Sequence, residues 1–185
     1  RLGIPSIIAT LGMMFAAMGL GLIASSGATM YGFPQAYTNL GQGRLLGLHI
    51  VIWVALLLFI SVFVLVHRSR FGYQVAAIGG NPEAARRFGL SVSKIQWSTY
   101  VLSGLFAAVM GILLTARLAS ARPDYSYGME MRAIVATIIG GTSLFGGVAT
   151  IPGTLAGAAI MGMLTDVLII LKVPTYWQDV FVGFL

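Results

Sequence analysis

The chain of 185 residues has 58% hydrophobic side chains, only 9% charged ones, and a mean hydropathy of +0.92. A soluble domain carries roughly 25% charged residues because water must wet its surface, so this composition excludes an ordinary soluble protein. Lys and Arg number 11 against 5 Asp and Glu, a net charge of +6. In so apolar a chain we interpret the positive excess as a membrane-orientation signal rather than a nucleic-acid surface.

The residue types also limit the chemistry. The chain has no cysteine, which excludes disulfides, thiol nucleophiles and Cys-ligated metals, and its two histidines argue against a multi-histidine metal site. We therefore predict no catalytic residue and no metal site. The chain opens on Arg1 and stops inside an apolar stretch at residues 181–185, so we expect a fragment of a longer membrane protein.

Four apolar stretches are long enough to cross a bilayer, which needs roughly 20 apolar residues in helical form. They cover about residues 4–24, 48–66, 95–116 and 153–171. The second stretch is rich in bulky aliphatic residues and is expected to prefer lipid. The other three carry small residues that favour close helix contact. We predict an all-α polytopic membrane protein, a transmembrane helix bundle that forms a single domain over residues 1–185.

The stretch from 133 to 150 is apolar but interrupted by Gly140, Gly141, Gly146 and Gly147. Each glycine costs a helix roughly 1 kcal/mol relative to alanine. We predict a glycine-broken or re-entrant segment, with a bent, tightly packed helix as the alternative. Irregular backbone at membrane depth is tolerated only where protein or a watery cavity satisfies its polar groups.

The connection at residues 67–94 holds five of the eleven basic residues and a single acid, Glu83. Positive residues concentrate in cytoplasmic loops, so we place this loop in the cytoplasm.

The residue types at 79–90, within this loop, predict a short helix. Asn81 is suited to cap its first amides, and Pro82 suits its first position. Glu83 would meet the positive end of the helix dipole, and Gly89 would end the helix in the left-handed conformation. So short a helix is marginal in water and needs a surface to lie against. That surface is either a cytoplasmic partner or the protein's own cytoplasmic face.

Glu83-Ala84-Ala85, followed after three residues by Gly89, resembles the EAA loop of ABC importer permeases. Its surroundings are similar to the ribose-type branch of that family, which includes permeases for xylose, arabinose, galactose and autoinducer-2. The same likeness extends over nearly the whole chain, through Ile4-Pro5, Ile8-Ala9-Thr10-Leu11-Gly12, Phe71-Gly72, Ala77-Ile78-Gly79-Gly80, Tyr100, Ser103-Gly104, Ala116-Arg117, Gly128-Met129-Glu130, Ala133-Ile134, Ile139 to Gly147 and Pro152-Gly153-Thr154.

The resemblance implies a non-enzymatic permease subunit of the bacterial inner (plasma) membrane, which moves a simple sugar or similar small polar solute into the cytoplasm. It implies three protein partners besides the solute and membrane lipid: a cytoplasmic ABC ATPase, which binds the ATP and Mg, a periplasmic substrate-binding protein, and a second permease copy or homologue. No nucleic acid and no cofactor of the chain's own are expected. Consistently, the sequence has no Gly-Lys pair and therefore no phosphate-binding P-loop.

The resemblance also assigns roles to individual residues. Ala84 and Ala85 would face a groove of the ATPase, Glu83 and Arg86 would make polar contacts, and Gly89 would end the lever. With the cap residue, the predicted ATPase-coupling set is Asn81, Glu83, Ala84, Ala85, Arg86 and Gly89.

Candidates for the translocation path lie in the glycine-rich segment and the last span. The exposed amides and hydroxyls of a broken helix suit a hydroxylated solute, although the same glycines also fit a close-packed structural turn. Asp166 is the one carboxylate inside a predicted span, where it either contacts solute or reaches interfacial water. The set is Gly140, Gly141, Thr142, Ser143, Gly146, Gly147 and Asp166.

Three rival functions were compared with the ABC importer. A branched-chain amino acid ABC permease would share the architecture, but the loop motif at 79–85 favours the sugar side. An ion-coupled secondary transporter or channel would need more intramembrane charge than Asp166 supplies. A membrane-embedded enzyme lacks paired catalytic groups.

Overall fold

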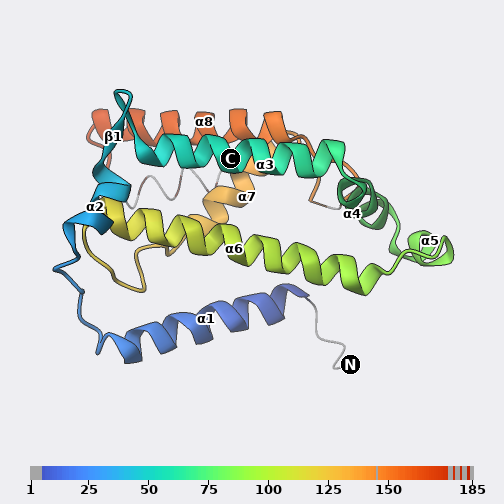
Figure 1. The fold of residues 1–185 in the computed structure, drawn as a ribbon, viewed down its shortest axis with the longest axis horizontal. Helices are drawn as coiled ribbons and strands as arrows, with labels where there is room; N and C mark the ends of the chain where they lie inside the picture. The colour runs from blue at the N-terminus through green and yellow to red at the C-terminus, as the bar shows by residue number, and fades with distance from the viewer. Residues whose placement is uncertain (1–5, 145, 175–176, 178–179, 181–182, 184–185) are drawn as a thin grey trace. The chain divides into compact units, whose positions relative to one another are not determined.

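The computed structural model describes residues 6–144, 146–174, 177, 180 and 183. Helices make up 72% of the described residues, so the prediction of an all-α membrane protein is confirmed. Residues 4 and 5, the start of the first predicted span, lie outside the described part. The elements labelled in Figure 1 are α1 (Ser6–Ala24), α2 (Gln35–Gln42), β1 (Arg44–Leu45), β2 (Leu48–His49), α3 (Ile50–Arg68), α4 (Arg70–Gly80), α5 (Pro82–Arg87), α6 (Val92–Leu118), α7 (Met129–Ile139) and α8 (Ile151–Ile170).

Three of these helices, α3, α6 and α8, are long and apolar enough to cross a membrane, by length and composition. They overlap the predicted spans 48–66, 95–116 and 153–171. No side chain of α3 is buried among the described residues. A helix covered so little by its own chain, and so apolar, suits contact with lipid.

The chain divides into two compact units, which are described separately. The first comprises Arg1–Ala55 and Leu105–Tyr127. In it, α2 lies against the C-terminal half of α6. Gly41 permits this contact because a Cβ there would collide with the backbone of Arg117. The amide of Gln42 donates to the Arg117 carbonyl at 3.0 Å, and the hairpin β1–β2 follows α2.

The second unit comprises Leu56–Gly104 and Gly128–Leu185. At the turn from α3 into α4, the hydroxyl of Ser69 accepts the N–H groups of Phe71 and Gly72 and caps α4. Helices α4 and α5 and the first turns of α6 then enclose a small apolar cluster, which we call the loop core. Its buried members are Ile78, Ala85, Val92 and Ile95.

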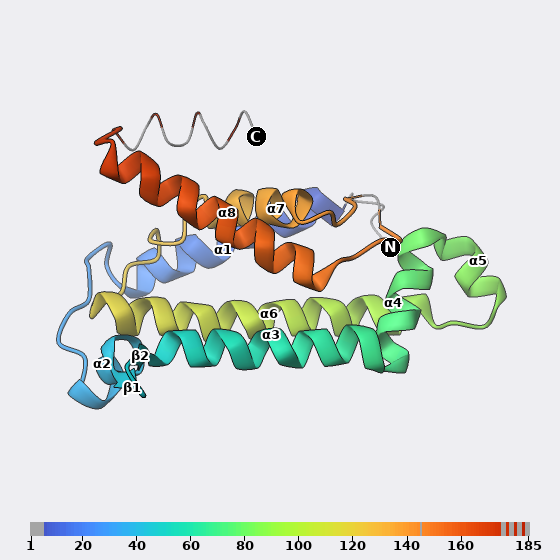
Figure 2. The ribbon, with the colours of Figure 1, turned by 90° about the horizontal axis from the view of Figure 1, so that it is seen from above.

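Helices α7 and α8 form the second packed element of this unit and lie side by side in both views (Figures 1 and 2). Gly157 allows their approach, since a Cβ there would overlap the carbonyl oxygen of Ala136. Gly140 and Gly153 likewise meet backbone to backbone. Between the helices, residues 140–144 and 146–150 are not helical, and Gly141, Gly146 and Gly147 have φ between +81° and +90°. The predicted break therefore exists, and it begins at Gly140, after a helix that occupies the first part of the predicted segment.

Small residues were expected to make close helix contacts on three spans, but among the described residues these spans differ in whether their glycines make such contacts. On α8, Gly153 and Gly157 contact α7 closely. On α1 and α6, a Cβ added to Gly12 or Gly111 would meet no described atom within 4 Å. The close helix contact that the small residues predict is thus made here by α8.

Candidate functional site

The short helix α5 begins as its sequence predicts. The side-chain oxygen of Asn81 accepts the N–H groups of Glu83 and Ala84, both at 3.0 Å, and Pro82 stands at the start of the helix. The backbone N–H of the same Asn81 donates to the carbonyl of Ala77 at 3.2 Å and so closes α4. One residue therefore ends one helix and starts the next, which ties the orientation of α5 to α4.

The other end of α5 is equally well defined. Gly89 has φ +79°, and its N–H donates to Arg86 at 3.0 Å while the N–H of Leu90 donates to Ala85 at 3.1 Å. This pair of bonds is the Schellman motif, which satisfies the last carbonyls of a helix. The six-residue helix is thus fixed at both ends by local hydrogen bonds.

The position of Ala85 corrects one expectation. Its side chain is only 4% exposed and lies in the loop core with Ile78, Val92 and Ile95. It therefore does not face outward toward an ATPase groove. Ala85 is buried because the first turns of α6 and the end of α4 pack against this side of α5 and cover it. Ala84, half-buried, remains at the edge of the outward surface.

The outward surface of α5 is formed by Glu83, Arg86, Arg87 and Phe88, which are all exposed. Phe88 is 86% exposed, although burying an aromatic ring of this size is normally favourable. Exposed aromatic and arginine side chains are the types enriched at protein interfaces. Sequence reasoning missed Phe88. The available signal was a large apolar residue immediately before the glycine that ends a helix in a charged loop.

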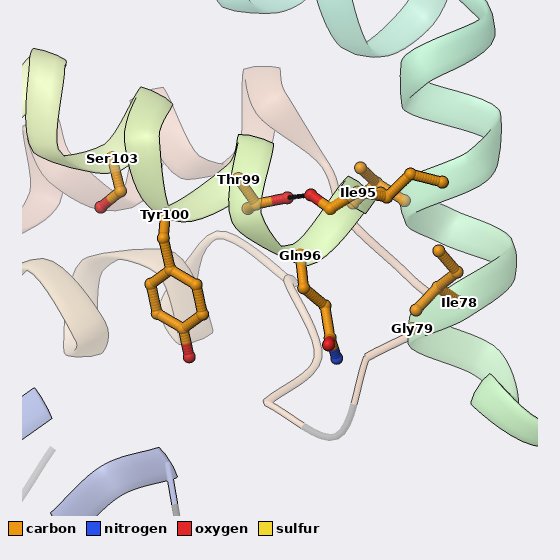
Figure 3. A pocket seen from close by; sticks show the side chains of 8 residues that line it. Ile78, Gly79, Ile95, Gln96, Thr99, Tyr100 and Ser103 are labelled. Atoms are coloured by element: carbon orange, nitrogen blue, oxygen red, sulfur yellow. Dashed lines mark hydrogen bonds between the residues drawn. The ribbon is translucent and has the colours of Figure 1, made fainter. Parts of the chain in front are cut away.

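A pocket of about 370 Å³ lies between α4 and the first half of α6 (Figure 3). This volume is within the usual range for small-molecule sites, roughly 300–1,000 Å³. Apolar side chains and Gly79 form one part of its wall, and α6 contributes the polar groups of Gln96, Tyr100 and Ser103. The hydroxyl of Thr99 donates to the Ile95 carbonyl at 2.9 Å within the helix. None of these residues was predicted as a site residue, because a scattered amide and hydroxyls on an apolar helix give no distinctive spacing.

The predicted path residues of the glycine-rich segment form an internally bonded turn. The hydroxyls of Thr142 and Thr154 lie 3.2 Å apart, and the N–H of Thr150 reaches Thr142 at 3.4 Å. The N–H of Ser143 donates to the carbonyl of Val148 at 3.1 Å. Gly140 and Gly141 continue from the end of α7, where Gly140 packs on α8 and Gly141 adopts the left-handed conformation. The hydroxyl of Thr142 is thus engaged in holding the turn.

The remaining path residues are separated from these bonds. Gly146 and Gly147 lie at the far side of the turn, against the end of α4. Asp166 lies in α8, exposed and near the C-terminal end of the helix at Ile170. The structure thus brings together the glycine-rich segment and the end of α4, which the sequence presents as separate motifs, and places Asp166 elsewhere on α8.

Long apolar helices with little internal cover, joined by a capped and positively charged loop, define a multi-pass membrane protein. The chain belongs to the family described as "Branched-chain amino acid transport system / permease component", whose model matches residues 1–185. Together, the family and the apolar helices indicate a protein of the bacterial inner (plasma) membrane.

Individual relatives carry more specific names. The L-arabinose ABC transporter permease protein AraH of Azospirillum brasilense is 40% identical over 96% of this chain and 52% of its own length. The ribose import permease protein RbsC of Escherichia coli K12 is 38% identical over 95% of this chain and 56% of its own. The autoinducer 2 import system permease protein LsrC of Klebsiella pneumoniae is 32% identical over 98% and 53%. The chain therefore spans about half the length of these relatives. No solved structure matches it.

These relatives agree with the recognised resemblance to the ribose-type branch. Despite the wording of the family description, the branched-chain amino acid alternative is not favoured, because the relatives named here are permeases for sugars or autoinducer 2.

Proposed function

We propose that the chain is part of the transmembrane permease of an ATP-driven importer, which carries a simple sugar or a similar small polar solute into the cytoplasm. The observation that carries the proposal is the similarity to permeases named for arabinose and ribose, 38–40% identical over nearly the whole chain. The three long apolar helices are the elements that would cross the membrane.

We further propose that α5 is the contact with a separate cytoplasmic ATPase. A coupling element must be attached firmly to its own protein and present a free surface to the partner. The loop core holds α5 through Ala85, and Phe88, Arg86 and Arg87 form the free surface. Five basic residues against one acid in the loop 67–94 favour an acidic or polar groove as the complementary surface.

The remaining partners follow from the same proposal. ATP and Mg are bound by the ATPase, since this chain has no P-loop sequence. A substrate-binding protein outside the membrane would deliver the solute, and a second permease copy or homologue would complete the pathway. Membrane lipid would cover helices such as α3, which the chain itself leaves uncovered.

The test is to replace Phe88 with Asp in the full-length permease and purify it with its ATPase. We expect co-purification to fall and ATP-driven uptake to drop by about a hundredfold, because loss of a central aromatic anchor costs roughly 2–4 kcal/mol at an interface. Insertion into the membrane should be unchanged, since Phe88 is largely free of its own chain.

Tyr73→Ala is the matched control, because Tyr73 is an aromatic residue of the same loop, 73% exposed, but lies on α4. It should leave uptake near the wild-type level. Normal uptake by Phe88→Asp, or an equal loss in both variants, would refute the role of α5. Uptake that persists without any ATPase and collapses when the ion gradient is dissipated would instead support a secondary transporter.

A further inference from the structure

Two glycine pairs from separate parts of the sequence meet in this structure. Gly79 and Gly80 end α4, immediately before the cap of α5, and Gly146 and Gly147 lie in the turn between α7 and α8. A Cβ on Gly79 would lie 2.9 Å from the backbone nitrogen of Gly147, and a Cβ on Gly146 would overlap the carbonyl oxygen of Gly79. The contact is therefore made by backbone against backbone, at the edge of the pocket in Figure 3.

A contact of this kind has little freedom to absorb movement. Where side chains separate two segments, a displacement can be taken up by a change of rotamer. At Gly79 and Gly147 no side chain lies between the segments, and close-packed protein interiors transmit strain. Gly146 and Gly147, with φ of +90° and +81°, adopt a conformation that glycine accepts at low cost.

Both sides of the contact are tied to larger elements. On one side, Asn81 joins α4 to α5 through four hydrogen bonds, and the loop core holds Ile78 against Ala85. On the other side, the pair Thr142 and Thr154 joins the turn to α8, and Gly140 packs against Gly153. A displacement of α5 thus has a continuous path of direct contacts to α7 and α8.

We propose that the contact of Gly79 with Gly146 and Gly147 is the joint through which movement of α5 is passed to the α7–α8 pair. The joint moves as one body, so that a pull on α5 changes the position of the turn. This inference rests on the proposed function, because it assumes that a partner moves α5. Gly79, Gly146 and Gly147 are positioning residues in this scheme.

A second connection runs from the loop core into α6 through Val92 and Ile95. It is the competing route for the same movement. The two routes are separable because Gly79 touches the turn, whereas its neighbour Gly80 would place a Cβ where no described atom lies within 4 Å.

The experiment compares Gly79→Ala with Gly80→Ala in the complete importer reconstituted in lipid vesicles, and measures ATP hydrolysis and solute uptake together. We expect Gly79→Ala to assemble and hydrolyse ATP while uptake per ATP falls about tenfold, within the usual range of coupling between sites. Gly80→Ala should match the wild type in both. A merely structural role would lower assembly and hydrolysis along with uptake. Uptake per ATP that is equal in both variants would overturn the joint and favour the α6 route. If ATP drives no uptake even in the wild-type importer, it is the proposed function that fails.

Discussion

In the second unit, the break between α4 and α5 and the break between α7 and α8 are formed in different ways. Between α4 and α5, the interruption is the single residue Asn81, which closes one helix with its backbone and opens the next with its side chain. Between α7 and α8, the interruption comprises the described residues 140–144 and 146–150, three of which are glycines at positive φ.

The difference lies in the range of the interactions that determine each break. At Asn81 every bond spans at most four residues along the chain, so the break would form in any surroundings that tolerate two helices. At 140–150, Gly140 packs against Gly153 and Gly146 against Gly79, so the course of the turn depends on distant backbone. The break at Asn81 is thus stabilised by the hydrogen bonds of one side chain. The break between α7 and α8 is stabilised by packing of backbone against distant backbone, which glycine permits because it has no side chain.

The strongest way to test this comparison is to add a methyl group where α7 and α8 touch. Gly157→Ala would place a Cβ against the carbonyl oxygen of Ala136, so the helices must separate. We expect a loss of about 1–3 kcal/mol, typical of overpacking, visible as a lower midpoint of thermal unfolding in detergent.

Gly162→Ala on the same helix is the control for that change, because its Cβ would meet no described atom within 4 Å. It should be neutral or slightly stabilising, since alanine is favoured over glycine in a helix by up to about 1 kcal/mol. Equal melting of the two variants would show that the α7–α8 contact does not depend on Gly157.

The local break is tested by Asn81→Ala, which removes the side-chain acceptor of two N–H groups. Loss of such a cap costs about 1 kcal/mol, and we expect the cost to fall on α5 alone. Hydrogen exchange of the Glu83 and Ala84 amides should quicken severalfold, while exchange in α8 stays unchanged. Asn81→Ser, which keeps a capping oxygen, should restore protection. If Asn81→Ala also loosened α8, the break would not be local.

The smallest effect is expected for Thr142→Val, which removes one hydroxyl from the turn at 140–150. The lost hydrogen bonds are worth about 1 kcal/mol or less, because the turn is also held by backbone packing. The half-saturation concentration for solute uptake should stay unchanged, as should that of Ser143→Ala. A marked rise for Thr142→Val alone would return this residue to the wall of the translocation path.

Sequence reasoning predicted much of the helical framework and missed the small elements. The apolar stretches predicted α3, α6 and α8 because about 20 predominantly apolar residues leave few alternatives to a membrane helix. The sequence analysis predicted no element between the spans 4–24 and 48–66, whereas α2 and the hairpin β1–β2 form there. Helix α2 is held by contacts with α6, such as the bond of Gln42 with Arg117, which no local sequence pattern predicts.

The amino-acid sequence by itself determined that this is a helical membrane protein, where α5 begins and ends, and that the segment after α7 must break. Each of these follows from hydropathy or from interactions between residues a few positions apart. Only the tertiary structure decided that Ala85 turns inward while Phe88 stays exposed, and that Gly79 meets Gly146 and Gly147. Both depend on which distant segments occupy the space around a short helix, and hydropathy and local spacing do not specify that.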